Sequence, residues 1–75
     1  MMRNGLTARQ RQCFLFIREQ VQATGVSPSY SEIAAALNLK NRGAVGRLVA
    51  CLEERGWVTS LPGKSRSVFP VEAAP

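Results

Sequence analysis

The residues best suited to chemistry lie in a basic stretch in the middle of the chain. From Lys40 to Arg66 there are six basic residues and two acidic ones, Glu53 and Glu54. Arginine can donate paired hydrogen bonds to guanine O6 and N7, and both lysine and arginine bind phosphate oxygens. With a net charge of +5 for the whole chain, this stretch predicts a polyanionic partner, and nucleic acid is the leading candidate.

One face of a helix expected at residues 42–55 combines a cation with small residues. At about 100° per residue, the apolar face consists of Val45, Leu48, Val49 and Leu52, and the opposite face consists of Gly43, Gly46, Arg47 and Ala50. Gly46 weakens a helix by about 1 kcal/mol relative to alanine, which folding alone does not explain. We expect the bare backbone to lie deep in a DNA groove, with Arg47 contacting a base. The alternative is that Gly46 is a tolerated defect and Arg47 a solvated charge.

Three polar residues, Lys40, Asn41 and Arg42, stand at the start of the same helix. A helix N-terminus already favours a phosphate, so these side chains are expected to position the DNA backbone rather than to read sequence. Ser29 and Tyr30 open the preceding helix and are also candidates for backbone contacts. For Tyr30 a half-buried packing role is an equal alternative.

The elements that position these residues follow from capping and periodicity. Thr7 to Gln10 is a capping box, and with Gly25 as the C-terminal stop it predicts a helix over about residues 8–24. A second capping box, Ser29 to Glu32, predicts a short helix that ends near residue 38. Residues 38–41 form the turn before the third helix, which ends near Arg55.

Two β-rich runs, residues 57–61 and 66–69, flank a Pro-Gly turn and predict a hairpin. Its basic tip residues, Lys64 and Arg66, are expected to contact phosphates or the minor groove, although a charged turn can also be merely solvated. The predicted fold class is mainly α with a small β-hairpin, a winged helix-turn-helix with three helices and a two-stranded wing. We expect one domain over residues 1–71 and a disordered tail at residues 72–75.

Composition argues against several other classes of protein. There is no histidine, and Cys13 and Cys51 are far apart in sequence, so we expect no metal site, no cofactor and two buried, reduced thiols. No acid pair in a plausible cleft or phosphate-cradling loop suggests an enzyme. No apolar run is long enough for a membrane span, and no signal peptide is apparent, so we expect a cytoplasmic protein at the bacterial nucleoid.

These motifs together resemble the N-terminal DNA-binding domain of the LexA repressor family, from about Leu6 to Val71. The resemblance is carried by Leu6-Thr7-Ala8-Arg9-Gln10, Phe14, Ile17, Arg18, Thr24-Gly25, Pro28, Glu32-Ile33-Ala34, Leu37, Leu52, Gly56, Gly63, Ser65 and Arg66. It implies a winged helix-turn-helix that reads DNA with its third helix. The family's repressors also carry a self-cleaving peptidase domain with a serine-lysine dyad. The sequence stops before such a domain, so we expect a reader without damage-triggered cleavage.

The start of the third helix departs from that family. Where its best-known members have a proline-asparagine pair followed by two glutamates, this sequence has Arg42-Gly43 and then Gly46-Arg47. An acidic reading surface has become a basic one, so the family's operator sequence cannot be carried over.

Two functions remain open. The leading hypothesis is a regulator of transcription, of bacterial or phage type, that binds specific sequences in double-stranded DNA. We expect it to act as a repressor rather than as an activator. A single small module buries only about 600–1,000 Å² on DNA, so we expect a homodimer on the operator. The alternative is a winged-helix adaptor that binds polymerase or another regulator. Leu15 and Phe16 fall off the apolar stripe of the first helix, so we expect at least one of them to face away from the core. A lone exposed leucine can be without function. The alternative is a contact with a second subunit or a protein partner, and the C-terminal strand is a further candidate for the subunit contact.

Overall fold

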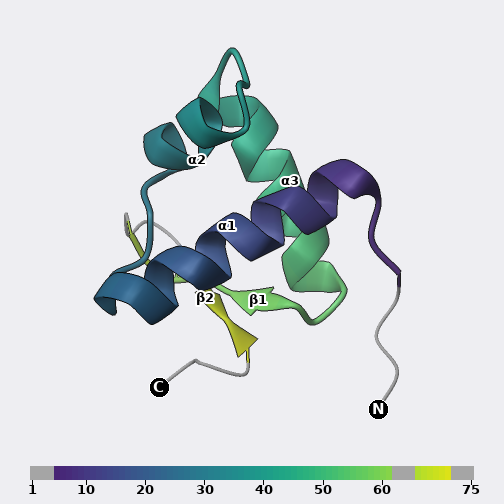
Figure 1. The fold of residues 1–75 in the computed structure, drawn as a ribbon. Coiled ribbons are helices and arrows are strands. Elements are labelled where there is room, and N and C mark those ends of the chain that lie inside the picture. The colour runs from purple at the N-terminus through teal and green to yellow at the C-terminus, as the bar shows by residue number, and fades with distance from the viewer. Residues whose placement is uncertain (1–4, 62–65, 72–75) are drawn as a thin grey trace.

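Three helices followed by a two-stranded sheet make up the part of the chain that the computed structural model describes, residues 5–61 and 66–71 (Figure 1). The helices are α1 (Ala8–Thr24), α2 (Tyr30–Ala36) and α3 (Arg42–Glu54). Strands β1 (Val58–Thr59) and β2 (Phe69–Pro70) pair antiparallel. In Figure 1 the turn between α2 and α3 lies at one end of α3 and the sheet lies near the other. The predicted fold class, a winged helix-turn-helix, is confirmed, with the paired strands β1 and β2 as the described part of the wing.

Both predicted capping boxes form. The Gln10 amide donates to Thr7 Oγ1 (3.2 Å), and the Thr7 amide donates to Gln10 Oε1 (3.0 Å). The Glu32 amide donates in the same way to Ser29 Oγ (3.1 Å), and the Ser29 amide donates to Glu32 Oε1 (2.9 Å). Gly25 ends α1 at φ +74°, a left-handed conformation in which a glycine has no Cβ penalty. Local sequence signals therefore set the start of α1 and α2 and the end of α1.

The core lies where the three helices meet the sheet. Phe14 of α1 contacts Trp57, which precedes β1, with ring centroids 5.1 Å apart and an interplanar angle of 68°. This edge-to-face arrangement is favourable for aromatic pairs and joins α1 to the base of the wing. The buried apolar residues are Cys13, Phe14, Ile17, Ile33, Ala34, Leu37, Val45, Val49, Leu52, Val58 and Val68.

The apolar face of α1 is wider than the sequence predicted. Leu15 and Phe16, which were expected to face away from the core, are partly buried and pack against it. The single-stripe prediction failed because α1 contacts α2, α3 and β2 at once, so more than one side of the helix is covered. Cys51 was expected to be buried but is only partly so. The large apolar side chains that are exposed within the described residues are Val26, Leu61 and Val71.

The paired strands are shorter than the predicted runs. The Ser67 hydroxyl accepts from the Leu61 amide (3.2 Å) and donates to the Leu61 carbonyl (3.1 Å), so a side chain takes the place of backbone pairing there. Arg66 has φ +53°, which is incompatible with an extended strand. The predicted turn tip and the tail at residues 72–75 lie outside the described residues. Within residues 5–61 and 66–71, no helix is both long enough and apolar enough to cross a bilayer.

Candidate nucleic-acid interface

The outer face of α3, defined by Gly43, Gly46, Arg47 and Ala50, points away from the core as predicted. Gly43, Arg47 and Ala50 are exposed and Gly46 is partly exposed. Val45, Val49 and Leu52 on the opposite side are buried, whereas Leu48 is only partly buried. The apolar side anchors α3 to the body of the domain and leaves a nearly bare surface facing outward.

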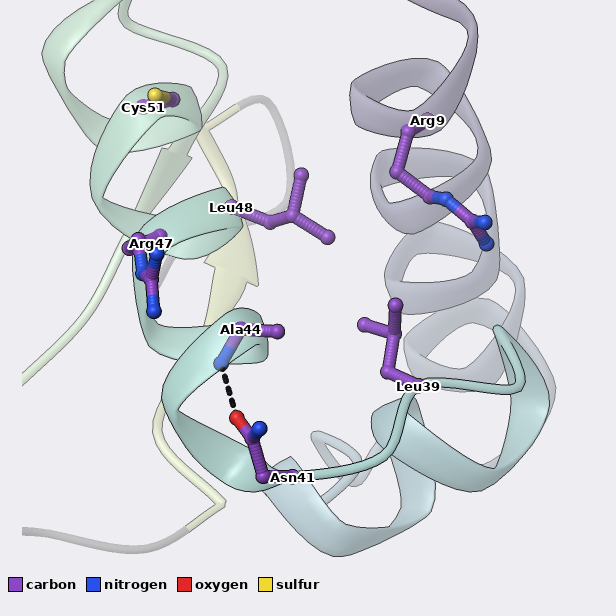
Figure 2. A pocket seen from close by; sticks show the side chains of 7 residues that line it. All are labelled: Arg9, Leu39, Asn41, Ala44, Arg47, Leu48 and Cys51. Carbon is purple, nitrogen blue, oxygen red and sulfur yellow. Dashed lines mark hydrogen bonds between the residues drawn. The ribbon is translucent and has the colours of Figure 1, made fainter.

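Asn41 gives the start of α3 a defined geometry. Its Oδ1 accepts a hydrogen bond from the Ala44 amide (2.9 Å), which makes Asn41 the N-cap (Figure 2). A Cβ added to Gly43 would lie 3.2 Å from that Oδ1, tighter than ordinary van der Waals contact. The cap therefore explains part of the need for glycine at position 43, a reason that the sequence did not reveal. The Asn41 amide nitrogen takes no part in the cap.

Gly46 lies beside Tyr30 of α2. A Cβ added at position 46 would stand 3.9 Å from Tyr30 Cε2, which is ordinary contact, so packing within the domain does not require glycine there. Tyr30 is partly buried and packs against the core, which supports the packing alternative for this residue. The adjacent Ser29 caps α2 through its oxygen, and its hydroxyl hydrogen is not used by that bond.

The cations around the outer face are not paired with any carboxylate of the described residues. Among the residues that the structure describes, Lys40, Arg42 and Arg47 are exposed and have no hydrogen bond or ion pair from their side chains. Residues 33–52 contain no carboxylate, so the turn before α3 and most of α3 bring no acidic side chain of their own to this surface. Such a surface attracts anions, because neither salt bridges nor nearby acids offset its field.

A groove of about 320 Å³ runs between α3 and the start of α1 (Figure 2). Leu39 and Leu48 point into it, Arg9 stands on the α1 wall, and Arg47 stands on the α3 wall. The Arg9 guanidinium donates from Nη1 to the Leu37 carbonyl at the end of α2 (2.7 Å), which fixes this wall. The sequence carried no sign of the groove, because it depends on a contact between residues 28 positions apart. The other lining residues are Asn41, Ala44 and Cys51.

The wing places Arg66 differently from the expectation of a free basic tip. Its guanidinium binds both carboxylate oxygens of Glu32, at 2.8 and 2.9 Å, and donates from Nη1 to the Ser27 carbonyl at 3.3 Å. The hydrogen bond from Arg66 is the main cause that lowers the pKa of Glu32, followed by the bond from the Ser29 amide. The same hydrogen bond raises the pKa of Arg66. Lys64, the other predicted wing contact, lies outside the described residues.

The two thiols occupy different surroundings. Cys13 is fully buried, and burial raises the pKa of its thiol to about 11. Cys51 is partly exposed at the groove. In the part of the chain that the structure describes, no three metal-binding side chains come together.

The chain has recognisable relatives. A family model described as the LexA DNA binding domain matches residues 3–67. The LexA repressor of Erythrobacter litoralis is 43% identical over 63 residues, which cover 84% of this chain and 27% of that protein. The LexA repressor of Pelagibacter ubique is 44% identical over 63 residues, covering 84% and 28%. The chain thus spans about a quarter of the length of these curated relatives.

Proposed function

Because this chain belongs to the LexA DNA binding domain family, we propose that it binds specific sequences in double-stranded DNA and represses transcription. One observation carries the proposal: an exposed, nearly bare helix face flanked by three cations that have no partner among the described residues. Such a helix fits the major groove, where the second helix of a helix-turn-helix unit reads base edges. This function places the protein at the chromosome, in the cytoplasm.

We assign base recognition to Arg47, whose guanidinium can pair with guanine O6 and N7. Gly43 and Gly46 allow the backbone to approach the base edges. Lys40 and Arg42 bind phosphates at the start of α3, and the Asn41 amide nitrogen is placed to join them. The Ser29 hydroxyl and Lys64 are the remaining proposed contacts to the DNA backbone.

The target sequence is expected to differ from those of relatives that present acidic residues on α3. Arg42-Gly43 and Gly46-Arg47 offer donors where glutamates would offer acceptors. Glutamate accepts from cytosine N4, whereas arginine donates to guanine, so the preferred bases must change.

We further propose that two copies bind a two-fold-related site, because one module of this size covers too little DNA for tight binding. Leu15 and Phe16 are poor candidates for the contact, since both pack against the core of their own chain. Sedimentation of the protein with its selected duplex measures the stoichiometry directly. Saturation at one protein per site would contradict the dimer.

Selection of bound sequences from a random duplex pool tests the function itself. We expect enrichment of a short, two-fold-symmetric site that contains guanine at the position facing Arg47. Titrations at several salt concentrations should then give a log–log slope of about −4 to −5, as for about four to six neutralised phosphates. A pool that yields no enriched sequence would refute specific DNA recognition.

A protein-binding adaptor would give the opposite salt behaviour, because a mainly apolar contact is little affected by ionic strength. The structure weakens the basis for this alternative, since the two side chains expected to mediate the contact are not exposed large apolar groups.

A further inference from the structure

The guanidinium of Arg66 is hydrogen-bonded to other residues of the same chain. The carboxylate of Glu32 accepts two hydrogen bonds from its guanidinium, and the Ser27 carbonyl accepts a third. Both ends of the ion pair are just under half exposed, at 46% and 45% of their side-chain surface. A paired guanidinium and carboxylate are neutral together, so Arg66 contributes little net attraction toward a phosphate.

The ion pair joins parts of the chain that are far apart in sequence. Glu32 lies in the first turn of α2 and also accepts from the Ser29 amide that begins this helix. Arg66 lies 34 residues later, in the wing. A single carboxylate therefore binds both the start of the helix-turn-helix unit and the wing.

A second, buried contact lies at the same place, the junction between the wing and the start of α2. Ser27 is fully buried, and its Oγ accepts a hydrogen bond from the Val68 amide (3.1 Å) while donating to the Pro28 carbonyl (3.1 Å). The segment before α2 is thus attached to the wing through both the side chain and the carbonyl of Ser27. Buried hydrogen bonds of this kind are costly to leave unmade, so they fix the separation of the two segments.

The backbone at Arg66 supports the same conclusion. Its φ of +53° lies in the left-handed region, which a residue with a Cβ rarely adopts and which costs about 1 kcal/mol or more. Such a conformation persists where surrounding contacts determine it. Here the contacts are the hydrogen bonds to Glu32 and Ser27.

We propose that Arg66 is a positioning residue that holds the wing against the start of α2 through Glu32, and that it is not a phosphate ligand. This rests on the proposed DNA binding and deepens it, because the separation between wing and α3 determines which phosphates both can reach together. The wing contacts DNA through other groups, and Arg66 sets where those groups lie.

Three single variants and one double variant separate positioning from phosphate binding, with affinity for the selected duplex as the readout. Glu32→Gln keeps an acceptor for the α2 capping box but loses the charge, and Arg66→Gln removes the guanidinium. We expect each to weaken binding about two- to five-fold, the range for an exposed ion pair, and the double variant to lose no more than either one. Arg66→Lys keeps the charge without the planar fork, so we expect it to behave like Arg66→Gln.

Opposite results would overturn the proposal. If Arg66 bound phosphate, Glu32→Gln would keep or improve affinity, because it removes a negative charge beside the DNA and releases the guanidinium. Arg66→Lys would then bind almost as well as wild type. Unfolding midpoints of all variants confirm that each is folded at the assay temperature.

Hydrogen exchange of the Val68 amide tests the junction without DNA. We expect faster exchange in Glu32→Gln and Arg66→Gln than in wild type, because the wing opens from Ser27 more often. Unchanged exchange in both variants would refute the positioning role even if DNA binding is confirmed. If no duplex binds the wild type, the proposed function fails while this measurement still reports on the junction.

Discussion

The cations at α3 and the cation of the wing differ in their hydrogen bonds and ion pairs. Lys40, Arg42 and Arg47 are exposed, and in the described part of the chain their side chains make no hydrogen bond or ion pair. Arg66 is bound by Glu32 and by the Ser27 carbonyl. All four fit a basic DNA-binding pattern equally well in the sequence, yet only Arg66 already has three of its five donors bonded to acceptors of its own chain.

The difference depends on where carboxylates lie in space. Glu32 is the last acidic residue before Glu53, so the turn and most of α3 have no acid of their own. The wing returns to the start of α2, where Glu32 is located. Whether a basic side chain can attract DNA therefore depends on whether a carboxylate of the same chain already pairs with it.

The largest expected effect is the difference in labelling rate between the two thiols, which tests whether the groove side of α3 is accessible. Cys13 is buried with a raised pKa of about 11, so N-ethylmaleimide should modify it only when the domain opens, about a thousand-fold or more slowly than an accessible thiol. Cys51 lies at the groove beside Arg47 and should react far faster in the native protein. Mass spectrometry of the labelled peptides measures both rates.

Duplex DNA should slow the labelling of Cys51 by covering it in the folded state. It should also slow the labelling of Cys13, because DNA that binds only the folded domain makes opening rarer. Cys51→Ala provides the control, since it leaves Cys13 as the remaining thiol. Labelling of Cys51 at the same rate under saturating DNA would show that the groove side of α3 is not covered.

The next effect is the loss of base discrimination in Arg47→Ala. We expect it to reduce the preference for the selected sequence by about 1–3 kcal/mol, because the bidentate contact to guanine is lost, while the unfolding free energy stays almost unchanged. Lys40→Ala is the matched comparison and should weaken all sequences alike, reducing the salt slope by about 0.9. Equal losses on every sequence for both variants would remove the distinction between them.

A smaller effect separates folding from binding at Gly46. Gly46→Ala should stabilise the fold by up to about 1 kcal/mol, since alanine favours a helix and the new Cβ meets Tyr30 at 3.9 Å. The same methyl should weaken DNA binding several-fold if the bare backbone approaches the bases. Ala50→Gly on the same face is the control, with lower stability and no added bulk. Thermal unfolding and duplex titration of both variants measure the two effects. If Gly46→Ala binds DNA as tightly as wild type, the proposed role of Gly46 in binding is contradicted.

The smallest effect is the pH dependence of the wing junction. Glu32 has a pKa below its ordinary value of 4.5 in the folded protein, so its stabilising contribution is complete above that value and is lost as the pH falls through the folded pKa. The difference in Tm between wild type and Glu32→Gln should therefore persist at pH 6 and disappear in strong acid. A difference that does not change with pH would exclude the charged pair as its source.

Local signals were read correctly from the sequence, whereas contacts between distant residues were not. Thr7, Ser29 and Gly25 act within one helical turn, and their predicted roles are confirmed. The pairing of Arg66 with Glu32 requires the wing to return to α2, and no periodicity encodes that approach. The burial of Leu15 likewise depends on how many elements cover α1.

At the candidate site the same limit applies. The outward orientation of Gly43, Arg47 and Ala50 follows from helical geometry and is confirmed, while their contacts with DNA remain a prediction. The crowding of Gly43 by the Asn41 cap and the groove against Arg9 were missed, because each depends on side-chain positions that only the folded chain defines.

The contact between Phe14 and Trp57 provides an intrinsic optical signal. Trp57 is the sole tryptophan of the chain, and it lines neither the groove nor the outer face of α3. Its fluorescence should therefore change when the base of the wing separates from α1, and it should respond little to a duplex bound at α3. Emission at this indole can follow unfolding in the same cuvette in which a dye on the DNA follows association.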